Sequence, residues 1–316
     1  MRVRVQRLAC MAVLAAGAWL GSLQAAEQGA DRSPRGQLLL GDGGSSSREA
    51  RREAIAGLQL ANMNEADRRA AEKVLRSTTL YRRLPVATFD CDPALLRFAL
   101  EKPEAIVDIW RVLGISLLTL DPVGPQQWRM CDGYGTVGVL RLMHKQHAEN
   151  GSATLVFHGH GSYSGQFAPQ ALTGTCLLLV RHRPTVSVGP GGPRHAMQID
   201  AFLDADGVGL ELVTRTLQPL IVRSGAANLH EISLFMESLS EAAEENPRGF
   251  DRLTGRLSRI SDEDRRALAA IGQNAAGGQP RSSMADPFAP DRLPADLAAR
   301  WMPADELEEQ ASGHRR

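Results

Sequence analysis

The order of the elements predicted in the middle of the chain constrains its fold most. Candidate strands are separated by clusters of Gly, Pro, Asn and Asp, and all of them precede a long apolar helix over 208–243. The predicted strands are Ile115–Leu120, Gln127–Met130, Gly135–Met143, Ala153–Tyr163, Leu172–Arg183 and Ala196–Leu203. In the last strand, Met197 and Ile199 alternate with Gln198 and Asp200, which is typical of a half-buried antiparallel strand. The pattern predicts an α+β fold, with an antiparallel sheet of about six strands, a long C-terminal helix packed across it, and flanking helical segments.

Several helices are predicted around these strands. Apolar residues recur at helical spacing over 48–76, which predicts one or two helices there. Asp92-Pro93 and Pro103 each indicate the start of a further helix. Near the C-terminus, Ser261-x-x-Asp264 is a capping signature at the start of another. Within the long helix, Pro219 or Gly225 is expected to kink or divide it.

The N-terminus has the three parts of a secretory signal. Arg2, Arg4 and Arg7 are followed by the apolar run Leu8–Leu20 and by small residues up to Ala26. The apolar run is about 13 residues long, whereas a spanning helix needs about 20. We therefore expect a signal peptide at 1–26, a periplasmic or extracellular location, and no transmembrane segment after cleavage.

Composition shifts divide the remaining chain. We predict a flexible leader and N-terminal helices over 27–79, a central α+β domain over 80–246, and a C-terminal helix with a disordered tail over 247–316. Lys+Arg and Asp+Glu both number 36, so loss of the three arginines in the signal leaves a net charge of −3. This charge gives the chain no electrostatic reason to bind nucleic acid.

The cysteines allow at most one disulfide within the mature chain. Beyond Cys10, the sequence contains Cys91, Cys131 and Cys176. Cys176 lies in an apolar run and is interpreted as a small buried hydrophobe. In an oxidising compartment the pair to test is Cys91 with Cys131, and the alternative is that all three thiols are reduced.

The sharpest chemical motif is His158-Gly-His160. Residues two apart on a strand face the same side, so both imidazoles can converge on a metal such as zinc. His195, His144 or Asp200 is a candidate for a third ligand. The alternative is a pair of solvent-facing histidines beside a glycine that packing requires. Zinc is the only cofactor that the sequence raises, and none is otherwise predicted.

A set of short motifs carries a resemblance to known sequences. They are Tyr81-Arg-Arg-Leu-Pro-Val86, Asp90-Cys-Asp-Pro93, Ile109-Trp110, Gly114-Ile115, Asp132-Gly-x-Gly-Thr136, Gly159-x-Gly-x-Tyr-x-Gly165 and Cys176-Leu-Leu-Leu179. With these motifs, the chain over 80–246 resembles a family of uncharacterised exported proteins of planctomycete-type bacteria, which implies export and no known activity. The element order is also similar to the START-like helix-grip fold. Members of that fold wrap a sheet round a long helix and commonly hold lipids or other apolar molecules between them.

Three functions are compatible with the sequence. The first is a noncatalytic binding or interaction module whose partner is a small apolar ligand or an envelope protein. The second is a metal-dependent hydrolase built on His158 and His160, and the third is an envelope scaffold. No dense cluster of acid, base and nucleophile favours an enzyme, and no catalytic residue is predicted. The candidate ligand-lining residues are Trp110, Phe202, Leu217, Ile221 and Phe235. The alternative is that these residues only pack in the hydrophobic core.

Overall fold

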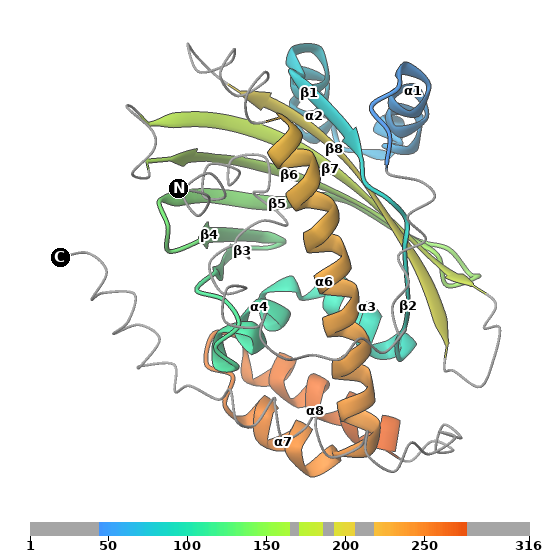
Figure 1. The fold of residues 1–316 in the computed structure, drawn as a ribbon, viewed down its shortest axis with the longest axis vertical. Coiled ribbons are helices and arrows are strands. Elements are labelled where there is room, and N and C mark those ends of the chain that lie inside the picture. Colours follow the sequence, from blue (N-terminus) through green and yellow to red (C-terminus); the bar gives the residue numbers. More distant parts are fainter. Residues whose placement is uncertain (1–43, 165–170, 186–192, 206–217, 277–316) are drawn as a thin grey trace. The chain divides into compact units, whose positions relative to one another are not determined.

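The structure, a computed structural model, describes residues 44–164, 171–185, 193–205 and 218–276 (Figure 1). Within these ranges the protein is α+β, with seven α-helices and one eight-stranded antiparallel sheet. The predicted signal peptide at 1–26, most of the leader, the tail beyond residue 276 and the candidate Leu217 lie outside the described residues. No helix within them combines the length and the apolar character that a bilayer span requires.

The chain forms two compact units. The first contains Met1–Thr88, Pro122–Pro184 and Ala196–Glu231, and the second contains Phe89–Asp121, Thr185–His195 and Ile232–Arg316. Residues 44–79 belong to the same unit as most of the sheet, and the domain boundaries predicted after residues 79 and 246 stay predictions.

Two helices open the described chain, as the periodicity over 48–76 predicted. Helix α1 (Arg48–Gly57) begins at Ser47, whose Oγ accepts a hydrogen bond from the Ala50 amide at 3.1 Å. Helix α2 (Glu65–Ser77) begins at Asn64, whose Oδ1 accepts from the Asp67 amide at 2.9 Å. These caps satisfy amides that have no partner inside the helices. A short 3₁₀ turn, η3 (Leu60–Asn62), separates the two.

The sheet has the order β1-β8-β7-β6-β5-β4-β3, with β2 also pairing with β8. Its strands are β1 (Leu80–Arg83), β2 (Ala87–Asp90), β3 (Thr119–Gly124), β4 (Gln127–Cys131), β5 (Thr136–His147), β6 (Ala153–Tyr163), β7 (Leu172–Thr185) and β8 (Arg194–Ala205). The expected six strands correspond to β3 to β8, with shifted ends. Strands β1 and β2 were not predicted, because four residues each are too few to show a convincing alternation.

The register separates the side chains of the sheet into two sets. Strand β6 pairs along its whole length with β5 and β7, so that Phe157 lies opposite Leu142 and Leu178, and Val156 lies opposite Leu179. We call the side of Val156 and Leu179 the α1–α2 face, and the side of Phe157 and Leu178 the opposite face. The register of β5 shifts between Leu142 and His144, which marks a β-bulge.

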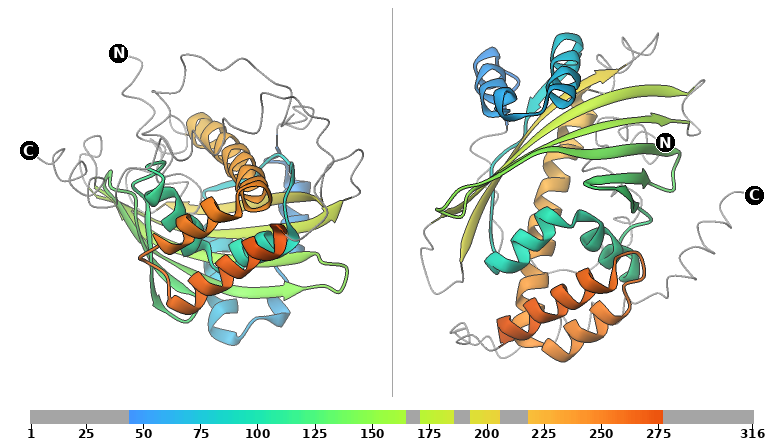
Figure 2. Two further views of the ribbon diagram at one scale, coloured as in Figure 1. Left: turned by 90° about the horizontal axis from the view of Figure 1, so that it is seen from below. Right: turned by 180° about the vertical axis from the view of Figure 1, so that it is seen from behind.

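Helices α1 and α2 cover part of the α1–α2 face (Figure 2). Their buried apolar residues form one cluster with residues from β1, β5, β6, β7 and β8. The cluster contains Ala50, Ala54, Leu58, Met63, Ala71, Val74, Tyr81, Met143, Val156, Leu177, Leu179 and Phe202. Helical spacing in α1 and α2 therefore places one apolar stripe on the sheet, as the sequence pattern requires.

The second unit is mainly helical. It holds α3 (Pro93–Glu101), α4 (Pro103–Val112), α7 (Pro247–Gly255), α8 (Asp262–Ala276) and the second half of α6 (Gln218–Glu245). The proline-led starts of α3 and α4 and the Ser261 cap of α8 agree with the sequence patterns, and Ser261 Oγ accepts from the Asp264 amide at 3.0 Å.

The long helix differs from its prediction in two respects. Helix α6 is continuous through Gly225, and Pro219 lies in its first turn, where a missing amide costs no intrahelical hydrogen bond. It is also not the C-terminal element, because α7 and α8 follow it. Two helices thus occupy the region where the sequence predicted one.

Candidate functional site

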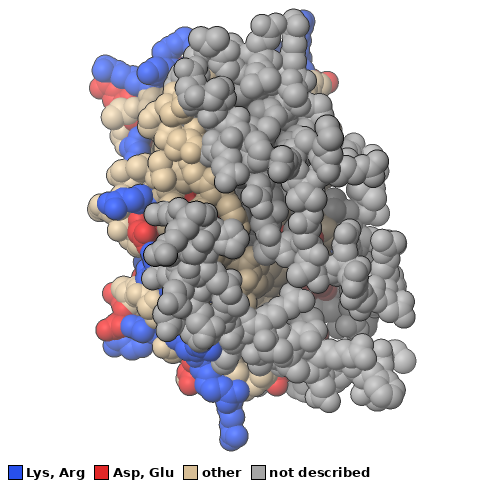
Figure 3. Space-filling view, turned by 60° about the vertical axis from the view of Figure 1, so that its left-hand side comes forward, with Lys and Arg blue, Asp and Glu red and all other residues tan. Residues whose placement is uncertain are grey.

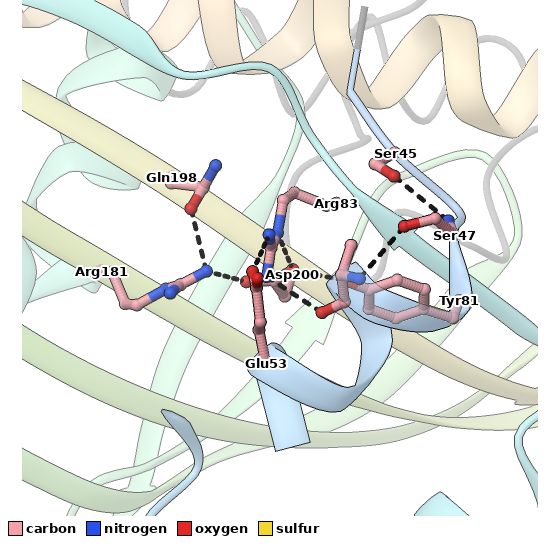
Figure 4. A network of polar contacts seen from close by, with 9 residues as sticks. Ser45, Ser47, Glu53, Tyr81, Arg83, Arg181, Gln198 and Asp200 are labelled. Atoms are coloured by element: carbon pink, nitrogen blue, oxygen red, sulfur yellow. Dashed lines mark hydrogen bonds and ion pairs between the residues drawn. The ribbon is translucent and has the colours of Figure 1, made fainter. Parts of the chain in front are cut away.

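A charged cluster on the α1–α2 face is centred on Asp200, which is fully buried (Figure 4). Tyr81 Oη and Arg83 Nε donate to Asp200 Oδ1 at 2.7 and 2.8 Å, and Arg181 Nη2 donates to Oδ2. Arg181 also donates to Gln198 Oε1 at 2.9 Å. Three strands, β1, β7 and β8, therefore meet at one buried carboxylate.

Arg83 connects this cluster to helix α1. Its Nη1 donates to Glu53 Oε2 at 2.8 Å, and its Nη2 donates to the Ala50 carbonyl at 3.0 Å. Burial alone lowers the pKa of Arg83, but the hydrogen bonds to Glu53 and Asp200 raise it above its ordinary value. Burial and the hydrogen bond to Asp200 also raise the pKa of Tyr81. Both groups therefore keep their protons at physiological pH.

A cleft of about 280 Å³ adjoins the cluster. Its walls are mostly polar and include Ser45, Ser47, Glu49, Glu53, Arg83 and Gln198. Each of the three nitrogens of Arg83 donates within the protein, so three of its five N–H groups are used to hold β1, β8 and α1 together. The arrangement fits an anchor that holds α1 on the sheet better than it fits a reactive site.

The structure places His158 and His160 on the α1–α2 face, two residues apart on β6. Across the strand pair they lie opposite Arg141 and Val139 of β5. Burial, followed by the charge of Arg141, lowers the pKa of His158. His160 is exposed, and its Nδ1 lies 3.3 Å from Thr175 Oγ1. The two imidazoles thus share a side of the sheet, as predicted, next to a cation.

His195, the third predicted metal ligand, has another environment. Its Nε2 lies 2.9 Å from the Cys91 carbonyl, its ring centroid is 6.2 Å from that of Phe89, and burial lowers its pKa. Among the residues that the structure describes, no group of three or more His, Cys, Asp or Glu side chains is placed to hold a metal. The zinc site stays a prediction.

One side of the surface carries charges of both signs. Figure 3 shows Lys and Arg interspersed with Asp and Glu along its margin, beside a broad area of uncharged residues. On the sheet itself, Val137 and Val139 of β5 are exposed by 48% and 39%. Both lie on the α1–α2 face, in register with Ser162 and His160 of β6.

Glycines gather on the opposite face of the sheet. Gly138, Gly161 and Gly174 lie in register on β5, β6 and β7, and Gly159 is next to them, opposite Cys176. A Cβ atom at Gly159 would lie 2.7 Å from Cys176 Sγ, so that position excludes a side chain. Glycine inside a strand often marks the close approach of another group to the backbone. Buried apolar side chains border these glycines on the same face, namely Trp128, Met130, Leu140, Phe157, Tyr163 and Leu178.

Two buried oxygen atoms lie at one end of this glycine row. Asp132 and Thr136 are each only 2% exposed. Asp132 Oδ2 and Thr136 Oγ1 are buried without a hydrogen-bond partner among the described residues. A buried polar group without a partner is uncommon in folded proteins, so this pair is the chemically distinctive feature of the opposite face.

The predicted ligand-lining residues separate into groups. Trp110 and Phe235 meet edge to face in the helical unit, with ring centroids 5.8 Å apart. Phe202 belongs to the core under α1 and α2, and its ring lies 5.0 Å from that of Tyr81. Ile221 lies in a part of α6 whose side chains are not described. The described candidates therefore do not form a single cluster.

No disulfide joins the described cysteines. Cys91 and Cys176 are buried, and Cys131 is half-buried. Burial raises the pKa of the Cys176 thiol to about 12, which fits its interpretation as a small apolar residue.

No protein-family model and no curated protein sequence matches this chain. Sequence reasoning missed the Asp132 and Thr136 pair as a site. The available signal was Asp132-Gly-x-Gly-Thr136 between two predicted strands, together with glycines in three strands.

Proposed function

We propose that this chain is an exported, noncatalytic binding module that holds a small apolar ligand against the opposite face of its sheet. The observation that carries this proposal is the burial of apolar side chains on both faces of β6 and β7. An antiparallel sheet commonly has one face on the core and one in water.

The adjacent residues of β7 illustrate this double burial. Leu177 and Leu179 pack under α1 and α2, whereas Cys176, Leu178 and Val180 point to the opposite face and are also at most 8% exposed. The opposite face is therefore a second apolar surface, and Gly138, Gly161 and Gly174 add no side chain to it where they lie in register.

The element order supports the same function. Strand β1 lies beside β8, the helical pair α3 and α4 comes between β2 and β3, and the long α6 follows β8. This order is similar to the START-like helix-grip fold that the sequence suggested, in which a sheet and a long helix enclose apolar molecules. Fold similarity alone assigns no ligand.

Helix α6 is proposed as the second wall of the binding site. Its first half belongs to the same compact unit as most of the sheet, and Leu229 in that half is 2% exposed. The part of α6 in this unit, residues 218–231, has 14 residues, which at about 1.5 Å per residue make a helix about 21 Å long. Such a helix is long enough to cover several strands, each about 4.8 Å from the next.

Native mass spectrometry tests the proposal. The mature protein is purified from its own envelope without added lipid or metal, and the metal content is measured on the same sample. We expect a retained apolar molecule of one defined mass that organic solvent extracts. A bare chain that also takes up no apolar probe in vitro would rule out ligand binding and leave the scaffold function. Stoichiometric zinc that is lost on replacing His158 and His160 would instead support the hydrolase.

A further inference from the structure

We propose that the ligand carries a hydrogen-bond donor, an ammonium or a hydroxyl group, at the end of an apolar body, and that Asp132 and Thr136 bind this head group. The inference rests on the proposed function, because it concerns the same face of the sheet. It adds the polar chemistry by which that face selects its ligand.

Asp132 is fixed where β4 turns into β5. Its Oδ1 accepts from the amides of Tyr134 and Thr136, both at 2.8 Å, and its own amide donates to the Thr136 carbonyl at 3.2 Å. These three hydrogen bonds hold the carboxyl group beside the first residue of β5. They use only one of its two oxygens, so Oδ2 remains available.

Thr136 faces the glycine row. It is paired with Tyr163, and two residues further along the same strand is Gly138, which is paired with Gly161. Val137, between Thr136 and Gly138, points to the other side of the sheet, where it is 48% exposed. The Thr136 hydroxyl therefore stands on the opposite face, at the edge of the row, buried and without a partner there.

The chemistry of these two atoms specifies a donor. A carboxylate oxygen only accepts hydrogen bonds, and a threonine hydroxyl accepts as well as donates. Leaving such groups buried without partners is unfavourable, because each has given up its hydrogen bonds to water. A ligand that donates to both atoms removes this cost, whereas an anionic head group meets the Asp132 carboxylate and is repelled.

The glycine row is the part of this face on which we place the apolar body of the ligand. Gly138, Gly161 and Gly174 put no side chain between the Thr136 and Tyr163 pair and the next apolar pair, Leu140 with Gly159. An apolar chain that starts at Asp132 and Thr136 can cross these glycines and continue over Leu140 and Phe157. Head group and body thus have separate, adjoining surfaces.

Matched probes test the inference on the intact mature protein. Decylamine, decanol, decyl methyl ether and decanoate share an apolar chain and differ in their head groups. Binding is measured by titration calorimetry below the aggregation threshold of each probe. We expect decylamine and decanol to bind at least about tenfold more tightly than the ether, and decanoate to bind most weakly.

Two variants locate the effect. Asp132→Asn keeps the Oδ1 acceptor for the backbone amides and replaces Oδ2 by a donor, and Thr136→Val removes the hydroxyl at constant shape. Asp132→Asn is expected to weaken decylamine binding by about tenfold, because an ammonium group cannot accept from the new amide, and Thr136→Val is expected to weaken decylamine and decanol binding by about tenfold. Thr136→Ser is expected to retain binding, and Thr175→Val, a matched change on the α1–α2 face, is expected to have no effect.

The outcomes separate the two proposals. Equal binding of all four probes, or variants that bind decylamine like the wild type, would overturn the role of Asp132 and Thr136 and leave ligand binding intact. Failure of every probe to bind, the ether included, would overturn the apolar binding function itself. If Thr136→Val does not fold, Asp132→Asn with Thr136→Ser still decides the matter.

Discussion

On the α1–α2 face, the buried carboxylate of Asp200 accepts from Tyr81, Arg83 and Arg181. On the opposite face, the equally buried Asp132 has one oxygen without a partner among the described residues. In the first arrangement both carboxylate oxygens accept hydrogen bonds, which suits an anchor between helix and sheet, although Arg181 Nε is buried without a partner among the described residues. The second leaves one buried acceptor without a partner among the described residues, and on this atom we based the proposed head-group contact. Burial of a carboxylate therefore does not by itself indicate function, and the decisive property is whether its acceptors are occupied.

The largest expected effect is loss of the Asp200 carboxylate. Asp200→Asn leaves Arg83 and Arg181 without their shared counter-charge, so we expect a loss of about 3–5 kcal/mol in the free energy of unfolding. Equilibrium denaturation in guanidinium chloride measures it. Asp204→Asn on the same strand is the control, because the Asp204 carboxylate accepts from Ser77 at an exposed position. If both variants unfold at the wild-type midpoint, the Asp200 cluster is not an anchor.

Truncating neighbouring leucines of β7 separates the two faces. Leu177→Ala and Leu178→Ala each remove a buried side chain, and each is expected to cost about 2–5 kcal/mol of stability. Only Leu178 points to the opposite face, so only Leu178→Ala is expected to weaken decanol binding. Denaturation and calorimetry on the same preparations check both effects. If only Leu177→Ala weakened decanol binding, the ligand would lie on the α1–α2 face, and the proposed binding surface would be wrong.

A smaller effect is expected from pH. Burial lowers the pKa of His158 below its ordinary value of 6.5, so the unfolded chain binds its proton more readily than the folded one. The stability that neutral His158 contributes is therefore complete above pH 6.5 and decreases as the pH falls from there through the lowered pKa.

Unfolding free energies measured across this pH range test the expectation. His158→Asn is expected to show a flatter decline on the acid side than the wild type. His160→Asn changes an exposed neighbour on the same strand and serves as the control. If the free energy of unfolding falls equally steeply with decreasing pH in the wild type and in His158→Asn, His158 does not contribute to this pH dependence.

The smallest effect concerns thiol reactivity. Cys176 lies on the opposite face with its pKa raised to about 12 by burial, and Cys91 is also buried, whereas Cys131 is half-buried. Brief alkylation of the native protein at mildly alkaline pH, followed by peptide mass mapping, is expected to modify Cys131 first. Rapid modification of Cys176 would mean that the opposite face is open to solvent.

The sequence predicted the elements with strong periodicity and missed the short ones. Helices α3 and α4 and strands β4 to β8 carry proline starts, apolar stripes or alternation that a local pattern can reveal. Strands β1 and β2 are four residues each, and β1 includes Arg82 and Arg83. Their strand state depends on pairing with β8, a contact that no local pattern encodes.

The candidate site was less accessible to sequence reasoning than the fold. The shared side of His158 and His160 follows from alternation alone and was predicted. The glycine row requires the register of three strands, and the bulge between Leu142 and His144 changes that register within β5. The sequence raised Asp200 as a metal ligand, whereas in the structure its carboxylate accepts hydrogen bonds from arginine and tyrosine side chains. The pairing of the strands that carry these side chains could not be predicted from the sequence.

The pairing of β1 with β8 also constrains the order in which parts of the chain can fold. Thr79 Oγ1 donates to the Leu203 carbonyl at 3.0 Å, although 124 positions separate the two residues in the chain. Contacts between such distant segments form slowly, because a long loop must close before they contribute. Helices α1 and α2 therefore complete their packing against the sheet only after β8, the last strand, has been synthesised. Until β8 has been synthesised, β1 has no strand to pair with among the described strands.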